Sequence, residues 1–80
     1  MQVVATIKLA NARAELGLSQ TELASLARVA RQTVVNGERG NKPIQRIQAY
    51  RILHALNAER QKWGKPALAL DDIDWKIVGQ

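Results

Sequence analysis

Apolar and polar residues alternate with the spacing of amphipathic helices along most of this 80-residue chain. The clearest case starts at Ser19, which forms with Glu22 the pattern of a capping box, where each side chain satisfies a backbone N–H of the other residue. The apolar residues that follow recur every three or four positions and give one face to bury. These residues are Leu23, Leu26 and Ala27. The pattern predicts a helix over residues 20–27.

A second, more polar helix is predicted to begin near Ala30. Val29 and Val34 point inward in this interpretation. The side chains left outside are Arg31, Gln32, Val35, Asn36 and Arg39. Gly37 and Gly40 are expected to end the helix, because glycine takes the left-handed conformation at little steric cost. So short a helix is not stable alone in water, so we expect its exposed side chains to serve a further purpose.

Helical spacing also predicts one helix before this pair and a longer helix after it. The first is expected over about residues 3–16, starting near Val3, with Gly17 as its C-terminal cap. The later helix is expected over about residues 43–63, with Pro43 at its first position, where a missing N–H is harmless. A break of this helix near Asn57 is an alternative.

Two interpretations are open for the apolar residues of the C-terminal segment, 64–80. In one, Trp75 and its neighbours dock back onto the domain and complete its core. In the other, Trp75, Ile77 and Val78 form a dimer contact, because aromatic and aliphatic residues often anchor small interfaces. The two interpretations are compatible.

The length and composition predict one soluble, cytoplasmic domain over residues 1–80. The chain has no cysteine, which excludes disulfides and thiolate metal sites and fits a reducing compartment. No apolar run approaches the roughly 20 residues of a membrane span, and the N-terminus lacks the pattern of a secretion signal.

The net charge of +5 is concentrated in one part of the chain. Six cations lie between Arg28 and Arg51, against Glu38 as the one anion, whereas cations and anions balance in the rest. The six are Arg28, Arg31, Arg39, Lys42, Arg46 and Arg51. A basic stripe on one helix and its flanks is typical of a protein that binds a polyanion.

Catalytic and metal-binding chemistry is not expected. The single histidine, His54, has no cysteine near it, and the aspartates at 71, 72 and 74 lack the glycine and distal glutamate of a calcium loop. The sequence contains no glycine-rich phosphate loop and no pattern of Ser, His and Asp residues typical of a catalytic triad. We therefore expect no enzymatic activity, no cofactor and no metal.

Residues 18–40 resemble the helix-turn-helix of the phage-repressor type, in the Cro and Xre family of transcriptional regulators. The residues that carry the resemblance are Leu18-Ser19-Gln20, Glu22-Leu23-Ala24, Ala27, Val29, Thr33 and Glu38-Arg39-Gly40. The resemblance implies an all-α, lambda-repressor-like domain of five helices that binds DNA, usually as a dimer. Three positions depart from the family pattern: Arg28 replaces a turn glycine, Ala30 replaces a Ser or Thr cap, and Gly37 replaces a core aliphatic residue.

The resemblance also implies roles for single residues. Arg31, Gln32 and Asn36 fall at base-reading positions, and their side chains can bond the edges of guanine and adenine in the major groove. Val35 is expected to contact the methyl group of a thymine, because an apolar, β-branched side chain on the exposed side of the helix would otherwise have no apolar partner. The expected phosphate contacts are Gln20, Thr33, Arg39, Asn41, Lys42 and Arg46. Arg13 is implied to reach Glu38 in a partly buried ion pair.

The leading hypothesis is a dimeric, sequence-specific repressor of phage, plasmid or mobile-element type, bound to a palindromic operator in double-stranded DNA. One alternative is an antitoxin that represses its own operon and grips a toxin protein through residues 63–80. Another is a protein-interaction module that has lost DNA binding, as the departures at Arg28, Ala30 and Gly37 would suggest.

Overall fold

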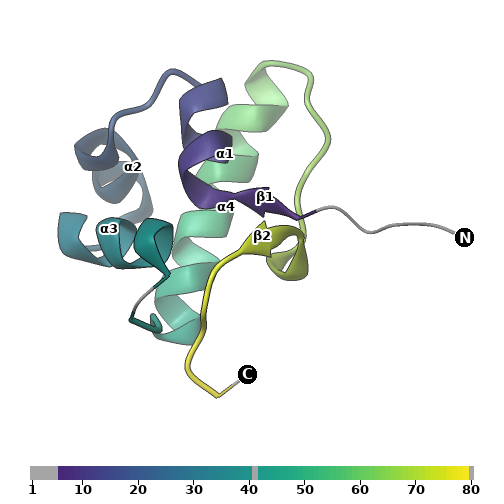
Figure 1. The fold of residues 1–80 in the computed structure, drawn as a ribbon. Helices are drawn as coiled ribbons and strands as arrows, with labels where there is room; N and C mark the ends of the chain where they lie inside the picture. The colour runs from purple at the N-terminus through teal and green to yellow at the C-terminus, as the bar shows by residue number, and fades with distance from the viewer. Residues whose placement is uncertain (1–5, 41, 80) are drawn as a thin grey trace, which may run out of the picture.

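The computed structural model describes residues 6–40 and 42–79, and in this part of the chain four α-helices surround one apolar core (Figure 1). The helices are α1 (Leu9–Glu15), α2 (Gln20–Ala27), α3 (Arg31–Arg39) and α4 (Arg46–Lys62). The expectation of five helices is wrong for the described residues. In place of a fifth helix the C-terminal segment forms a single 3-10 turn, η1 (Leu70–Asp72), and a short strand, β2 (Ile73–Asp74). No helix in the described ranges is both long and apolar enough to span a membrane.

The first helix is shorter than its apolar spacing predicts. It begins at Leu9, because Ile7–Lys8 form a strand, β1, that pairs in parallel with β2. The register places Ile7 beside Ile73, and Figure 1 shows the two strands lying together although they come from opposite ends of the chain. Val3, where this helix was expected to begin, lies outside the described residues.

The start of α4 also differs from the prediction. Pro43 precedes the helix, because Ile44 is extended and forms a β-bridge with Ile77. The Ile44 N–H donates to the carbonyl of Lys76 at 3.0 Å, and the Val78 N–H donates to the carbonyl of Ile44 at 2.9 Å. The helix then begins at Arg46 and continues to Lys62 without a break near Asn57.

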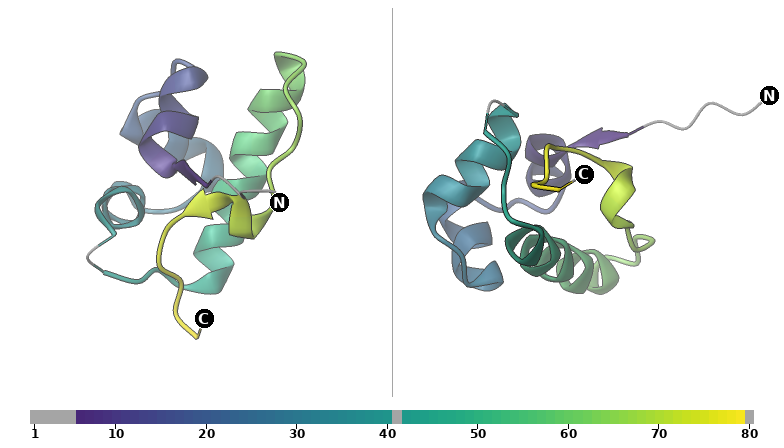
Figure 2. Two further views of the ribbon diagram at one scale, coloured as in Figure 1. Left: turned by 45° about the vertical axis from the view of Figure 1, so that its right-hand side comes forward. Right: turned by 90° about the horizontal axis from the view of Figure 1, so that it is seen from below.

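Two polar side chains of α4 hold the segment that leads to β2. Asn57 bonds the backbone of Leu68 in both directions, donating to its carbonyl at 2.9 Å and accepting from its N–H at 2.8 Å. Arg60 is buried and donates to the carbonyl of Pro66 at 2.8 Å and to Glu15 at 3.2 Å. Figure 2 shows this segment running back along α4 towards β2.

The C-terminal segment docks onto the domain, as the first of the two interpretations predicted. Ile73 and Ile77 are buried in the core, and Trp75 packs against it with its indole N–H donating to the carbonyl of Leu70 at 3.2 Å. Val78 is exposed. The largest fully buried side chains come from all four helices: Leu9, Leu23, Val34, Ile52 and Leu56.

The turn between α2 and α3 has a conformation that favours glycine, the residue that Arg28 replaces in the family pattern. Arg28 has φ 58° and ψ 45°, in the left-handed region where glycine is favoured. Ala30 occupies the N-cap position of α3 and makes no side-chain cap bond, as predicted. α3 thus forms even though neither residue suits its position.

Gly37 does not end α3, as had been expected, because only Gly40 takes the left-handed conformation there, with φ 70°. Gly37 lies inside the helix and is buried. A Cβ atom at this position would stand 3.0 Å from Cδ2 of Leu9. The missing side chain therefore allows α1 to approach α3 closely.

Candidate nucleic-acid interface

The start of α2 is fixed by the capping box. The Ser19 hydroxyl accepts from the Glu22 N–H at 3.0 Å, and the Glu22 carboxylate accepts from the Ser19 N–H at 2.8 Å. The backbone bond from Ser19 lowers the pKa of Glu22, since it stabilises the ionised form. The rigid first turn that results carries Gln20, the first residue of α2.

An ion pair joins α1 to the last turn of α3. Arg13 Nε donates to Glu38 Oε2 at 2.6 Å, its Nη2 donates to Glu38 Oε1 at 3.3 Å, and its Nη1 donates to the carbonyl of Leu18 at 2.8 Å. The side chains of Arg13 and Glu38 are 19% and 8% exposed. The pair implied by the family resemblance is present, and it anchors α3 to the domain from behind.

Gln20 links this ion pair by hydrogen bonds to Arg31, the first residue of α3. Its Nε2 donates to Glu38 Oε1 at 2.8 Å, and its Oε1 accepts from Arg31 Nη2 at 3.0 Å. Only this orientation of the amide satisfies both partners, because a carboxylate accepts and a guanidinium donates. Four side chains from three helices, Arg13, Glu38, Gln20 and Arg31, are thus linked into one chain that holds the Arg31 guanidinium.

Two further polar residues lie beside Arg31 on the outer side of α3. Gln32 is exposed, Asn36 is half-buried one turn later, and Gln32 Nε2 donates to Asn36 Oδ1 at 3.0 Å. The bond leaves the Gln32 carbonyl oxygen and the Asn36 amino group for other partners. An acceptor beside a donor is the arrangement that complements N6 and N7 of adenine.

A family model described as helix-turn-helix matches residues 9–63, which is more than half of the chain. The chain belongs to the helix-turn-helix family. The matched residues run from the first residue of α1 to the residue after α4, and they support a DNA-binding regulator of the Cro and Xre type. Neither the search of curated proteins nor the search of solved structures gives a match.

The helix-turn-helix places two of the predicted DNA-contacting residues away from the surface. Val35 is 7% exposed, so the expectation that it faces outward is wrong. It follows the fully buried Val34 and lies about 100° from it around α3, at the edge of the buried side of the helix. Thr33, expected at a phosphate, is also buried, because it lies about 200° around α3 from Arg31.

The other predicted phosphate contacts lie at the surface, with one outside the described residues. Arg39, Lys42 and Arg46 are exposed at the end of α3, in the turn and at the start of α4. Asn41 lies outside the described residues. Gln20 is half-buried within the network above, so its side chain supports Arg31 in this structure.

The charge of the helix-turn-helix is separated between surface and interior. All six cations between Arg28 and Arg51 are exposed, whereas Glu38 turns inward to Arg13. The basic stripe therefore presents its positive charge to solvent, and the one carboxylate within residues 28–51 does not neutralise it. Such a surface attracts the phosphate backbone of a nucleic acid.

Proposed function

We propose that α3 enters the major groove of B-DNA, where Arg31, Gln32 and Asn36 read base edges. The observation that carries the proposal is the bond from Arg31 to Gln20, which holds a guanidinium at the start of a helix whose inner side is anchored by an ion pair. Helix-turn-helix proteins use the first residues of the second helix in this way. An arginine so held is suited to bidentate bonding of guanine.

Contacts to phosphate position α3 in this proposal. Arg39, Lys42 and Arg46 are the cations that we assign to the backbone, because they are exposed at the end of α3, in the turn after it and at the start of α4. The first turn of α2, which carries Gln20, adds a helix N-terminus that favours an anion. Phosphate contacts fix the orientation of the protein, and the base contacts supply the specificity.

We further propose that two copies bind a palindromic operator and repress transcription. One domain of this size covers only about 600–1,000 Å² on DNA, and two half-sites one turn apart, about 34 Å, reach useful affinity. A shallow hollow beside Pro43, Trp75 and Val78 offers an apolar surface to the second copy. Ile77 belongs to the core, so of the sequence-predicted dimer contacts only Val78 and the open side of Trp75 stay in the proposal.

An antitoxin is the second candidate, favoured by the exposed indole of Trp63 at the end of α4. Against it, most of the segment assigned to a toxin is already engaged, since Leu68 bonds Asn57 and β2 pairs with β1. A toxin would have to bind this folded surface. A stable binary complex with a neighbouring gene product would be the result that favours this candidate.

The test is a selection from random duplex DNA with the whole protein, followed by titration of the winner at several salt concentrations. The proposal expects a palindrome with two half-sites one turn apart, bound at least about a thousandfold more tightly than random DNA. Enrichment of no sequence, with weak binding that disappears at physiological salt, would overturn it.

A further inference from the structure

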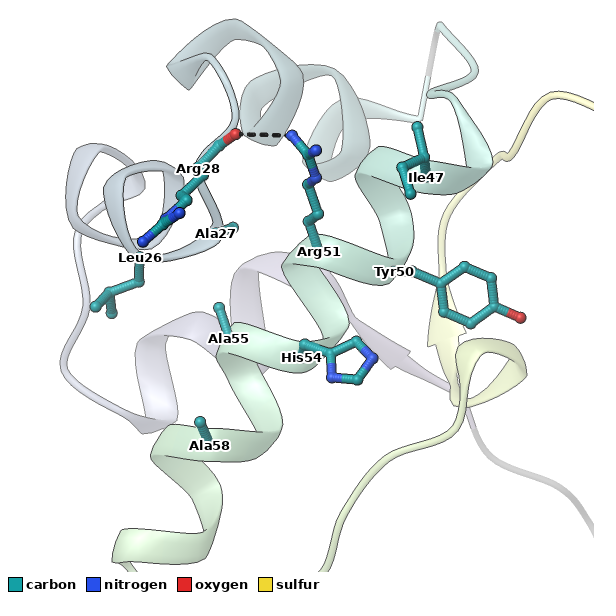
Figure 3. Close-up of a pocket in the computed structure, with 9 residues that line it drawn as sticks. All are labelled: Leu26, Ala27, Arg28, Ile47, Tyr50, Arg51, His54, Ala55 and Ala58. Atoms are coloured by element: carbon teal, nitrogen blue, oxygen red, sulfur yellow. Dashed lines mark hydrogen bonds between the residues drawn. The ribbon is translucent and has the colours of Figure 1, made fainter.

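A groove lies between the end of α2 and the outer side of α4, and the proposed DNA contacts do not use it. It has a volume of about 600 Å³. Figure 3 shows Leu26 and Arg28 on one side and Ile47, Tyr50 and His54 on the other, with Ala55 between them and Ala58 further along α4. The rings of Tyr50 and His54 point away from α2.

The walls of the groove expose large apolar side chains to solvent. Leu26 is 51% exposed, Ile47 is 62% exposed and Tyr50 is 41% exposed. None of the three belongs to the apolar core, whereas Ala27 and Ala55, which also line the groove, are in or against it. Exposed apolar side chains gathered around one hollow are typical of a surface that binds another molecule.

The shape of the groove suits a helix. Its α4 side runs from Ile47 to Ala58, a rise of about 16 Å, or three helical turns. The floor consists of alanines, Ala27, Ala55 and Ala58, which allow another backbone to approach closely. Amphipathic helices bind grooves of this kind through apolar side chains spaced three and four residues apart.

The positive charge of the groove favours an acidic helix as its partner. Arg28 and Arg51 stand at one end, where Arg51 donates to the carbonyl of Arg28 at 3.4 Å, and both residues are exposed. No carboxylate is among the described residues that line the groove. A second copy of this surface would bring arginine against arginine, whereas an acidic segment would meet opposite charge.

The groove borders the proposed DNA contacts without including them, since Arg28 precedes Arg31 by three residues and Ile47 follows Arg46. It is at the C-terminal end of α2, and Gln20, which bonds Arg31, is at the N-terminal end, about 10 Å away along the helix. None of Arg31, Gln32 and Asn36, the proposed base-reading residues, lines the groove.

We infer that this groove binds an acidic amphipathic helix of a partner protein. Leu26, Ile47 and Tyr50 contact its apolar side, and Arg28 and Arg51 pair with carboxylates along its edge. The inference does not depend on the identity of the operator, and it would give the DNA-bound protein a means of recruiting another protein.

The test uses the whole protein, labelled with 15N, and three synthetic peptides of about 14 residues. The peptides share leucines at helical spacing and differ only in their flanking residues, which are glutamate, glutamine or lysine. The acidic peptide is expected to shift the amide signals of Ala27, Ala55 and Ala58 and to bind at least about tenfold more tightly than the basic one. Equal binding of all three peptides, or shifts centred elsewhere, would overturn the inference.

Three variants sharpen this test. Ile47→Asp is expected to weaken the acidic peptide at least about tenfold, whereas Ala67→Asp adds the same charge at an exposed site outside the groove and should change binding less than about twofold. Arg51→Glu should reverse the preference from the acidic to the basic peptide. An unchanged amide spectrum outside the groove checks that each variant is folded, and unaltered binding by Ile47→Asp would contradict the inference.

Two further experiments test whether the groove binds duplex DNA or a second copy of the protein instead. If Arg28→Glu and Arg51→Glu weaken duplex DNA binding as much as Arg39→Glu does, the arginines serve DNA and the inference is wrong. If the protein sediments as a dimer that Ile47→Asp dissociates, the groove is covered by a second copy and the inference is equally wrong.

Discussion

The side-chain carbonyl of Gln20 accepts a hydrogen bond of 3.0 Å from Arg31, while the amino group of the same amide donates to Glu38 at 2.8 Å. A residue at the start of α2 thereby sets the position of the arginine that we assign to base reading. Gln20 fell at a phosphate-contact position by family resemblance, and the structure gives it this second role. The two roles predict different results for the same substitution.

Gln20→Ala should weaken binding to the selected duplex about tenfold, or about 1.4 kcal/mol, because Arg31 loses the partner that orients it. Binding to random duplex should change less than about twofold. Fluorescence anisotropy with both duplexes measures the two effects, and Thr21→Ala, at the neighbouring exposed position, is the control. Equal losses on both duplexes would mean that Gln20 acts only on phosphate.

Arg13→Ala should destabilise the folded domain by about 3 kcal/mol, because the Glu38 carboxylate, 8% exposed, would lose its ionic partner. Urea unfolding followed by tryptophan fluorescence gives the change. The matched control is Lys62→Ala, which breaks a pair of 2.8 Å with Glu59 in which the lysine is exposed. That change should be less than about 0.5 kcal/mol, and a similar loss for the two variants would refute an anchoring role for Arg13.

Arg28→Gly should stabilise the domain by about 1 kcal/mol, because glycine adopts φ 58° without the steric strain of a side chain. The Arg28 carbonyl, which accepts from Arg51, is kept in this variant. Ser25→Gly, within α2, should instead destabilise by about 0.5 kcal/mol. Thermal unfolding of both variants decides the matter, and a loss of stability in Arg28→Gly would contradict a strained turn.

The lowered pKa of Glu22 predicts a pH dependence of stability. Since the pKa is lower in the folded than in the unfolded chain, the ionised carboxylate stabilises the fold at neutral pH, and this contribution is lost as the pH falls through that pKa. Glu22→Gln keeps an acceptor for the Ser19 N–H but does not titrate. The advantage of the natural protein over this variant should shrink between about pH 5 and pH 3 in thermal unfolding. An advantage that stays constant or grows would oppose the prediction.

The features that the sequence predicted correctly are mostly those that depend on neighbouring residues. The capping box needs only Ser19 and Glu22 three residues apart, and the bounds of α2 follow from it. The left-handed Arg28 and the ion pair of Arg13 with Glu38 followed from resemblance, because their positions match a family pattern.

The features that were missed depend on contacts between distant segments. Two-residue strands carry no periodic signal, so the pairing of Ile7 with Ile73 and the bridge from Ile44 to Ile77 were not visible in the sequence. Both pairings take residues that looked helical or helix-capping and make them extended. They also explain why the C-terminal segment forms no fifth helix.

The candidate site was predicted in outline and corrected in detail. Arg31 and Gln32 lie at the surface as expected, but helical spacing alone put Val35 among them, and its actual burial depends on the side chains around it. The bond from Gln20 to Arg31 requires three helices to be placed together, which no local pattern encodes.

The most direct test of the central claim, that the start of α3 reads bases, is a scan of single base-pair changes in the selected duplex with the natural protein and with Arg31→Ala. The account predicts that the variant loses about 1–3 kcal/mol and becomes indifferent to one base pair, while it discriminates at the others as before. Lys42→Ala should weaken binding to every duplex alike. It should also reduce the slope of the logarithm of the binding constant against the logarithm of salt concentration by about one. If Arg31→Ala also weakens all duplexes equally and keeps every base preference, the claim is contradicted.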